Sequence, residues 1–311
     1  MIPVSCGPRP STTRSTLASM PACFRAGRFG EETQSGSNNG GNGEGSFHHR
    51  SRHGRTDEHI EARPCLLNEE VAPTIGRKTD SIDALAPGRL RLGVGTSHRQ
   101  VMENVYGLSM PSPLAYLREY VQVMRQGLWE GRVDHQGTFF KVATSFPRQA
   151  QIPLLISALG EKAFRLAGEI ADGAISWVCP VPYLLATALP ALRAGAQAQH
   201  RPVPPLVAHI PVAMSTDEVA VQAAVKPRIS FYTKAPFYAH MFAAAGFPLA
   251  ADGTGVDALV KALVIAGNEA QVEKRLRELI ASGLDELLLM LMPVADEARE
   301  REQLIQVIGS L

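Results

Sequence analysis

Arg89-Leu-Arg-Leu-Gly-Val-Gly-Thr-Ser-His98 decides the fold, and it directly follows the chain breaker Pro87-Gly88. Its apolar residues alternate as in a β-strand: Leu90, Leu92 and Val94. Gly93 and Gly95 stand at the end of this strand, where the missing Cβ lets backbone N–H groups come close to a ligand. Ligands of parallel α/β folds bind at the carboxyl ends of the strands. We therefore interpret the stretch as a cofactor platform.

The Gly-x-Gly of this stretch lacks the third glycine of the dinucleotide-binding fingerprint, because His98 occupies that position. A Rossmann site is thus disfavoured. An ordinary tight turn after a buried strand remains the alternative, and the rest of the chain has to decide between them.

Composition narrows the class of protein. The 311 residues are 45% hydrophobic, which is enough for one large α/β domain or two smaller ones. A formal net charge of +1 gives no reason to expect nucleic acid or a membrane as a partner, and no apolar run is long enough to cross a bilayer. The four cysteines lack C-x-x-C spacing, so we expect a reducing, cytoplasmic compartment with neither a disulfide framework nor a metal site.

Residues 1–68 differ from the rest of the chain. They carry no sustained strand or helix period, and residues 34–46 form a low-complexity run that predicts disorder. Four histidines follow and are expected to be solvated rather than metal-bound: His48, His49, His53 and His59. Residues 1–30 are basic and free of acids like a transit peptide, but their prolines oppose the required helix. An alternative is that this stretch is not native sequence.

Residues 69–311 are predicted to form one domain in which strands and helices alternate. The expected strands are 89–95, 153–157, 174–178, 206–214 and 286–291, with a hairpin at 133–146. The expected helices are 69–85, 113–131, 161–171, 183–199, 219–245 with interruptions near Pro227 and Pro236, 269–282 and 297–311. This alternation predicts a parallel sheet with helical crossovers. Only five parallel strands are visible, whereas a closed (β/α) barrel has eight.

A second candidate site lies at Ser157-Ala-Leu-Gly160, which joins a strand to a helix that begins Glu161-Lys162. Backbone N–H groups and the helix dipole favour an anion there, most naturally a phosphate. Trp177 ends the next strand on the same rim. The alternative is that Gly160 is a plain loop glycine.

Three blocks of the sequence together resemble the bacterial luciferase-like monooxygenase superfamily. They are residues 86–98, residues 166–177 (Leu-Ala-Gly-Glu-Ile-Ala-Asp-Gly-Ala-Ile-Ser-Trp) and residues 266–289, and they span about 80–311 in the order of the family. Within it, Ser97-His98 and Tyr106-Gly107-Leu108 are most similar to oxidoreductases that use the deazaflavin coenzyme F-420 (F420).

The resemblance implies a TIM-type (β/α) barrel in which the strand at 89–95 is the fourth. Strands one to three have no counterpart in residues 1–68, so the predicted barrel is incomplete, with strands four to eight present. The strands at 89–95 and 286–291 would then each lack a neighbour on one side. Exposed apolar edges favour association, so a homo-oligomer or aggregate is expected.

The resemblance also implies a cofactor position. The ring of F420, or of FMN in the alternative, would lie across the barrel mouth, with its phosphate on Ala158, Leu159 and Gly160. Gly95 and Thr96 would approach the ring through their backbone.

The remaining site residues follow from the same resemblance. His98 would donate a hydrogen bond or a proton to the reacting oxygen, unless it only caps a helix. Trp177 would shape the substrate pocket, unless it belongs to the core. The implied function is hydride transfer between F420 and a small organic substrate. The alternatives are an FMN-dependent alkanal-type monooxygenase and an inactive, truncated or frameshifted fragment.

Overall fold

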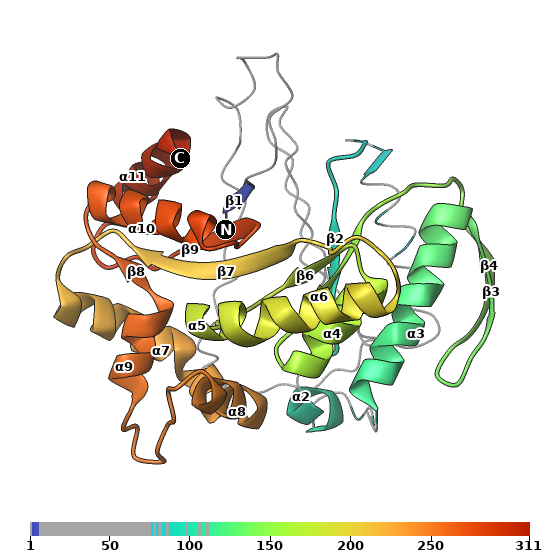
Figure 1. The fold of residues 1–311 in the computed structure, drawn as a ribbon, viewed down its shortest axis with the longest axis horizontal. Coiled ribbons are helices and arrows are strands. Elements are labelled where there is room, and N and C mark those ends of the chain that lie inside the picture. Colours follow the sequence, from blue (N-terminus) through green and yellow to red (C-terminus); the bar gives the residue numbers. More distant parts are fainter. Residues whose placement is uncertain are drawn as a thin grey trace, which may run out of the picture.

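A seven-stranded sheet forms the centre of the computed structural model, which describes residues 2–5, 76, 79, 83–84, 87–97, 99–104, 107, 109 and 112–311 (Figure 1). In spatial order its strands are β1 (Ile2–Ser5), β9 (Glu286–Leu291), β7 (Leu206–Ala213), β6 (Gly173–Ile175), β5 (Leu154–Ser157) and β2 (Leu92–Val94), and β8 (Ile265–Ala266) pairs with the end of β7. All neighbours pair in parallel except β1, which is antiparallel to β9. Five consecutive strands of the sheet are parallel: β2, β5, β6, β7 and β9. They correspond to the predicted strands four to eight of an incomplete (β/α) barrel.

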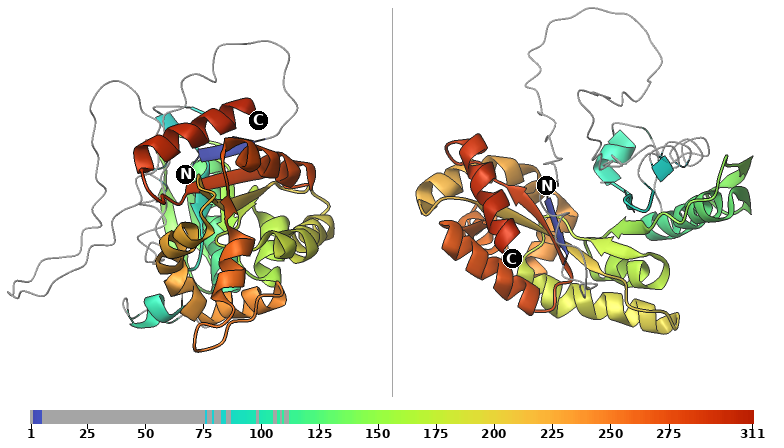
Figure 2. Two further views of the ribbon diagram at one scale, coloured as in Figure 1. Left: turned by 90° about the vertical axis from the view of Figure 1, so that its left-hand side faces the viewer. Right: turned by 90° about the horizontal axis from the view of Figure 1, so that it is seen from above.

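Most helices lie along one side of the curved sheet, and α2 (Arg99–Asn104) lies on the other side from α4 (Glu161–Ile170) and α6 (Leu189–Ala198) (Figure 2). The other α-helices of the described residues are α3 (Pro113–Arg125), α5 (Val181–Tyr183), α7 (Glu218–Lys234), α8 (Pro236–Ala244), α9 (Val256–Leu263), α10 (Glu269–Ala281) and α11 (Glu297–Ser310). Two π-helical turns, η2 (Gln126–Glu130) and η3 (Leu184–Ala188), extend α3 and precede α6. Every helix among the described residues is too short or too polar to cross a bilayer.

The two faces of the sheet differ because side chains alternate along each strand. Leu92 and Val94 belong to the hydrophobic core beneath the helices. The opposite face of the sheet is concave. On this face Arg91, just before β2, forms an ion pair with Glu286 of β9, and the two nitrogen–oxygen distances are 2.7 and 2.8 Å. Since β2 and β9 lie far apart in the strand order, this pair spans the concavity. Residues in register with Glu286 share its face, among them Val207.

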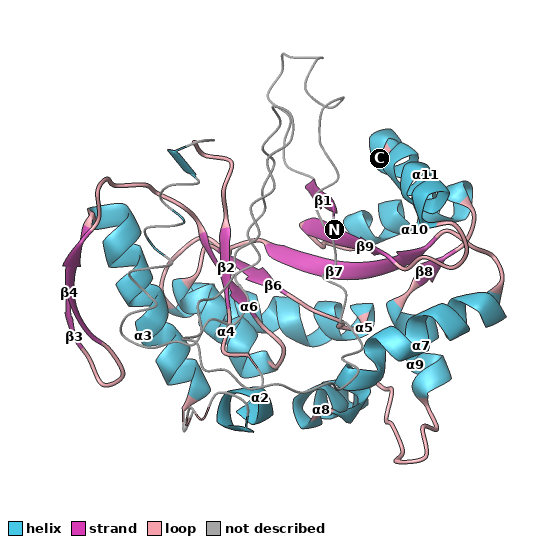
Figure 3. Cartoon of the chain, turned by 180° about the vertical axis from the view of Figure 1, so that it is seen from behind, coloured by secondary structure: helices cyan, strands magenta, loops and turns pink. Residues whose placement is uncertain are grey.

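Several predicted boundaries are confirmed. The helix at 113–131 is found as α3 followed by η2, and Gly131 ends it in the left-handed region (φ 72°). The hairpin consists of β3 (Arg132–Gln136) and β4 (Lys141–Ser145), which pair with each other and stand beside α3, apart from the main sheet (Figure 3).

Other expectations need correction. Helix α7 runs through Pro227 without a break, and only the interruption at Pro236 is found. The elements α9 and β8 were not predicted. The strand at 286–291 does not have a free edge, because Ile2–Ser5 pairs with it. The predictions of disorder and of solvated histidines for the first 68 residues concern positions that, apart from 2–5, lie outside the described residues, as does most of the expected helix at 69–85.

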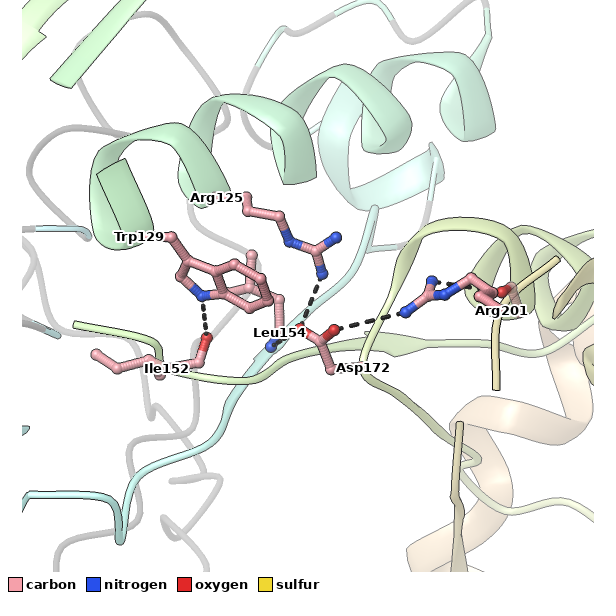
Figure 4. A network of polar contacts seen from close by, with 7 residues as sticks. Arg125, Trp129, Ile152, Leu154, Asp172 and Arg201 are labelled. Atoms are coloured by element: carbon pink, nitrogen blue, oxygen red, sulfur yellow. Dashed lines mark hydrogen bonds and ion pairs between the residues drawn. The ribbon is translucent and has the colours of Figure 1, made fainter. Parts of the chain in front are cut away.

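Ion pairs fix the N-terminal end of the sheet around Asp172, which directly precedes β6 (Figure 4). Its carboxylate accepts hydrogen bonds from the Leu154 amide (2.9 Å) and the Arg125 guanidinium (2.8 Å), and Arg201 lies 3.6 Å away. Arg125 also lies 4.5 Å above the ring of Trp129. Asp172 therefore joins β5 and β6 to α3 and to the segment after α6. These contacts lie at the N-terminal end of the sheet, so the opposite, C-terminal rim is the one where a ligand is expected.

Candidate functional site

Three predicted segments meet at the C-terminal rim, because β5 lies between β2 and β6 in the sheet. Gly95 and Thr96 follow β2, Ala158–Gly160 follows β5, and Trp177 follows β6. The structure thus brings together the segments that sequence reasoning had singled out. His98, the predicted catalytic residue, lies outside the described residues.

Glycines remove side chains from the β2 part of the concave face. A Cβ on Gly93 would lie 2.9 Å from Cδ1 of Ile175, and one on Gly95 would lie 3.0 Å from Cβ of Ser157. Both distances are shorter than normal carbon–carbon contacts. The Ile175 and Ser157 side chains thus occupy the space beside the two glycines and leave no room for larger residues at these positions, and the backbone of both glycines is partly exposed.

The loop before α4 offers fewer free amides than predicted. Ala158 is buried and its N–H donates to the carbonyl oxygen of Ile175 (2.9 Å), so this amide is not available to a phosphate. Gly160, in contrast, is exposed at the N-cap position of α4, and its Cα has open space around it. The first amides of a helix have no intrahelical acceptor, which makes Gly160 the better placed part of the predicted anion site, with Leu159 directly before it.

Two residues of the rim have a strained backbone. Ser97 (φ 58°) follows β2 and Val178 (φ 48°) follows β6. The left-handed region is disfavoured for residues other than glycine, above all for a β-branched valine, and such strain costs on the order of 1–3 kcal/mol. Strained residues cluster at functional sites, so their position supports this rim as the site.

Trp177 is half-buried and held in a fixed orientation by contacts with two other elements. Its indole stacks on the imidazole of His209 in β7, with ring centroids 4.1 Å apart and an interplanar angle of 19°. Its Nε1–H donates to the hydroxyl oxygen of Tyr232 in α7 at 2.8 Å. The predicted pocket residue is therefore packed against the core and presented at the rim at the same time.

Sequence reasoning missed His209. The side chain is fully buried, and its Nδ1 accepts a hydrogen bond from the backbone N–H of Val178 (3.2 Å). Burial lowers the pKa of His209 to about 3, so the imidazole is neutral and its proton sits on Nε2, which has no hydrogen-bond partner. The only signal in the sequence is one imidazole inside an otherwise apolar strand.

A separate cavity of about 350 Å³ lies between α7 and α9, beyond the ends of β7 and β8. Its polar lining includes Thr216, Gln222 and Lys261, and none of its lining residues belongs to the predicted site. Among the described residues, no group of three or more His, Cys, Asp or Glu side chains is placed to hold a metal ion.

The chain belongs to the luciferase-like monooxygenase family, whose model matches residues 72–286. This confirms the resemblance inferred from the three sequence blocks.

Relatives within the family are named as F420-dependent enzymes. The F420-dependent glucose-6-phosphate dehydrogenase of Nakamurella multipartita is 39% identical over 125 residues, which cover 38% of this chain and 36% of that protein. The enzyme of the same name from Kineococcus radiotolerans is 27% identical over 234 residues, which cover 70% and 67%. The chain thus spans between about a third and two thirds of the length of these relatives.

Solved structures agree with the fold. An F420-dependent secondary alcohol dehydrogenase, solved with an F420–acetone adduct, superposes with a TM-score of 0.61 over 77% of this chain and 74% of its own, at 19% sequence identity. At this identity the likeness supports the architecture alone.

Proposed function

We propose that the chain is an F420-dependent oxidoreductase that transfers hydride between the deazaflavin and a small organic substrate. The observation that carries the proposal is the pair of partly exposed glycines, Gly93 and Gly95, at the end of β2, next to the exposed N-terminus of α4 on the same rim. The relatives from Nakamurella multipartita and Kineococcus radiotolerans are named as F420-dependent enzymes, which supports the choice of cofactor.

The residues present fit such a group. A flat ring needs a surface without side chains, which Gly95 and Thr96 would supply through their backbone, and a phosphate needs the amides of Leu159 and Gly160. When bound, the deazaflavin would supply hydride chemistry. The chain's own residues would orient ring and substrate, and Trp177 would exclude water from one side of the pocket. The proposed proton donor is His98.

A fluorescence titration of the purified 311-residue chain with F420 and, separately, with FMN tests the proposal. We expect saturable binding of F420 and weaker binding of FMN. Binding of FMN without binding of F420 would instead favour the alkanal-type monooxygenase. Absence of both would contradict the proposed function and favour a non-catalytic chain, whereas turnover would exclude that alternative.

Gly160→Pro is expected to weaken F420 binding about tenfold, because proline removes an amide that would donate to the phosphate and stiffens the loop. A charge-assisted hydrogen bond contributes on the order of 1.5–3 kcal/mol, which corresponds to about tenfold or more in Kd. Gly160→Ala is the matched control, since it keeps the N–H and its Cβ would meet no atom within 4 Å. Equal Kd values for the two folded variants would remove Gly160 from the site.

A further inference from the structure

The concave face has a second row of side chains beyond the ion-paired Glu286. Ile175, Val207 and Glu286 are in register across β6, β7 and β9. Two residues further along these strands come Trp177 and His209, which therefore face the same side. The stack between the two rings is a cross-strand contact at the C-terminal end of the concave face.

Three contacts determine where the Trp177 indole lies. His209 covers one of its faces, Tyr232 accepts its N–H, and the next residue, Val178, donates its own N–H to His209 Nδ1. Val178 makes this bond from a left-handed conformation that costs free energy. The amide of His209 in turn donates to the Ser176 hydroxyl oxygen (3.2 Å). His209 thus contacts the residues on both sides of Trp177: its imidazole accepts the Val178 amide, and its own backbone amide donates to the Ser176 side chain.

Packing alone does not explain a histidine at this position. A phenylalanine would offer a ring of similar shape for stacking, without a buried Nε2–H that lacks a partner. What histidine adds is the Nδ1 acceptor that receives the Val178 amide. The imidazole therefore couples the ring stack to the backbone conformation of the rim, and it pays for this with one unsatisfied donor.

We propose that His209 is a positioning residue that holds Trp177 as the fixed wall of the ligand site. One face of the indole is covered by the imidazole, and the side chain is only half-buried, so its exposed part is available to a ligand and suits a flat, uncharged ring or an apolar group. This inference rests on the proposed function, because it assumes that the ligand occupies this rim.

The test uses the full chain carrying Trp129→Phe, so that Trp177 is its only tryptophan. In this background we expect F420 to quench the Trp177 emission on binding. His209→Phe should keep the stack but lose the Nδ1 acceptor; we expect Kd to rise about tenfold and the Trp177 anisotropy to fall. Its melting temperature should change little, because the variant removes one unsatisfied donor and creates another at Val178.

Tyr232→Phe, which removes the acceptor of the indole N–H, should raise Kd about threefold. His200→Asn on the opposite, N-terminal side of β7 is the control and should leave Kd and emission unchanged. If F420 binds and both Kd and anisotropy stay the same in the His209 and Tyr232 variants, the positioning role is wrong while the proposed function stands. If neither F420 nor FMN binds, the proposed function fails, and unchanged Trp177 anisotropy in His209→Phe would independently overturn the positioning role.

Discussion

Gly168→Ala is expected to destabilise the folded chain by about 3 kcal/mol, because α4 and α6 touch backbone to backbone at this residue. A Cβ on Gly168 would lie 2.1 Å from the carbonyl oxygen of Leu192, and a Cβ on Gly195 would lie 2.0 Å from that of Arg165. Backbone atoms cannot swing aside as a flexible side chain can, so the two helices would have to separate. Overpacking of this kind costs about 1–3 kcal/mol and occasionally more.

The effect should appear as a lower urea concentration at the midpoint of unfolding, while the dependence of the unfolding free energy on urea concentration (the m-value) stays unchanged. Gly309→Ala is the matched control: this glycine also lies in a helix, α11, but its Cβ would meet no atom within 4 Å. Alanine is the better helix former, so we expect the control to gain about 0.5 kcal/mol. A Gly168→Ala variant as stable as the Gly309→Ala control would show that the helices do not cross this closely.

The arrangement of the barrel could be predicted because local patterns and global fold agree along most of the chain. Apolar runs between breakers marked β5, β7 and β9, and the Ser112-Pro113 start and Gly131 end marked the long helix. The rim site followed from the same reasoning, since the carboxyl ends of neighbouring parallel strands must meet.

The features that were missed depend on contacts between distant residues. The pairing of Ile2–Ser5 with β9 joins segments almost the whole chain apart, and no local pattern encodes it. Helix α7 tolerates Pro227 although proline usually breaks helices. The amide of Ala158 is taken by Ile175 of the adjacent strand, which composition cannot reveal. The role of His209 likewise depends on the backbone conformation of Val178 and the position of α7.

Glu119 of α3 shows how a buried carboxylate can fix the hairpin that the sequence predicts at 133–146. Its side chain accepts hydrogen bonds from the backbone amides of Thr138 (3.1 Å), Phe139 (2.9 Å) and Phe140 (2.6 Å) in the turn between β3 and β4. Nε2 of His135 lies 3.1 Å from the same carboxylate. Glu119→Ala should therefore cost about 3 kcal/mol of stability, because several donors lose their acceptor at once.

The same contacts predict a pH dependence. Burial acts to raise the pKa of Glu119, but the hydrogen bonds from Phe140, Phe139 and His135 outweigh it, and the net shift is downward from the ordinary value of 4.5. The folded pKa thus lies below the unfolded one, so the ionised carboxylate contributes its full stability above about pH 4.5 and loses it as the pH falls through the folded pKa.

Urea unfolding of the wild-type chain and of Glu119→Gln, measured from pH 3 to pH 8, tests this last prediction. Glutamine keeps one acceptor oxygen but cannot ionise, so the stability gap between the two proteins should be constant at neutral pH and shrink below about pH 4.5. Glu130→Gln, an exposed position one turn beyond α3, should show no such pH-dependent gap. A stability gap that stays constant down to pH 3 would mean that the negative charge on Glu119 does not contribute to the free energy of unfolding.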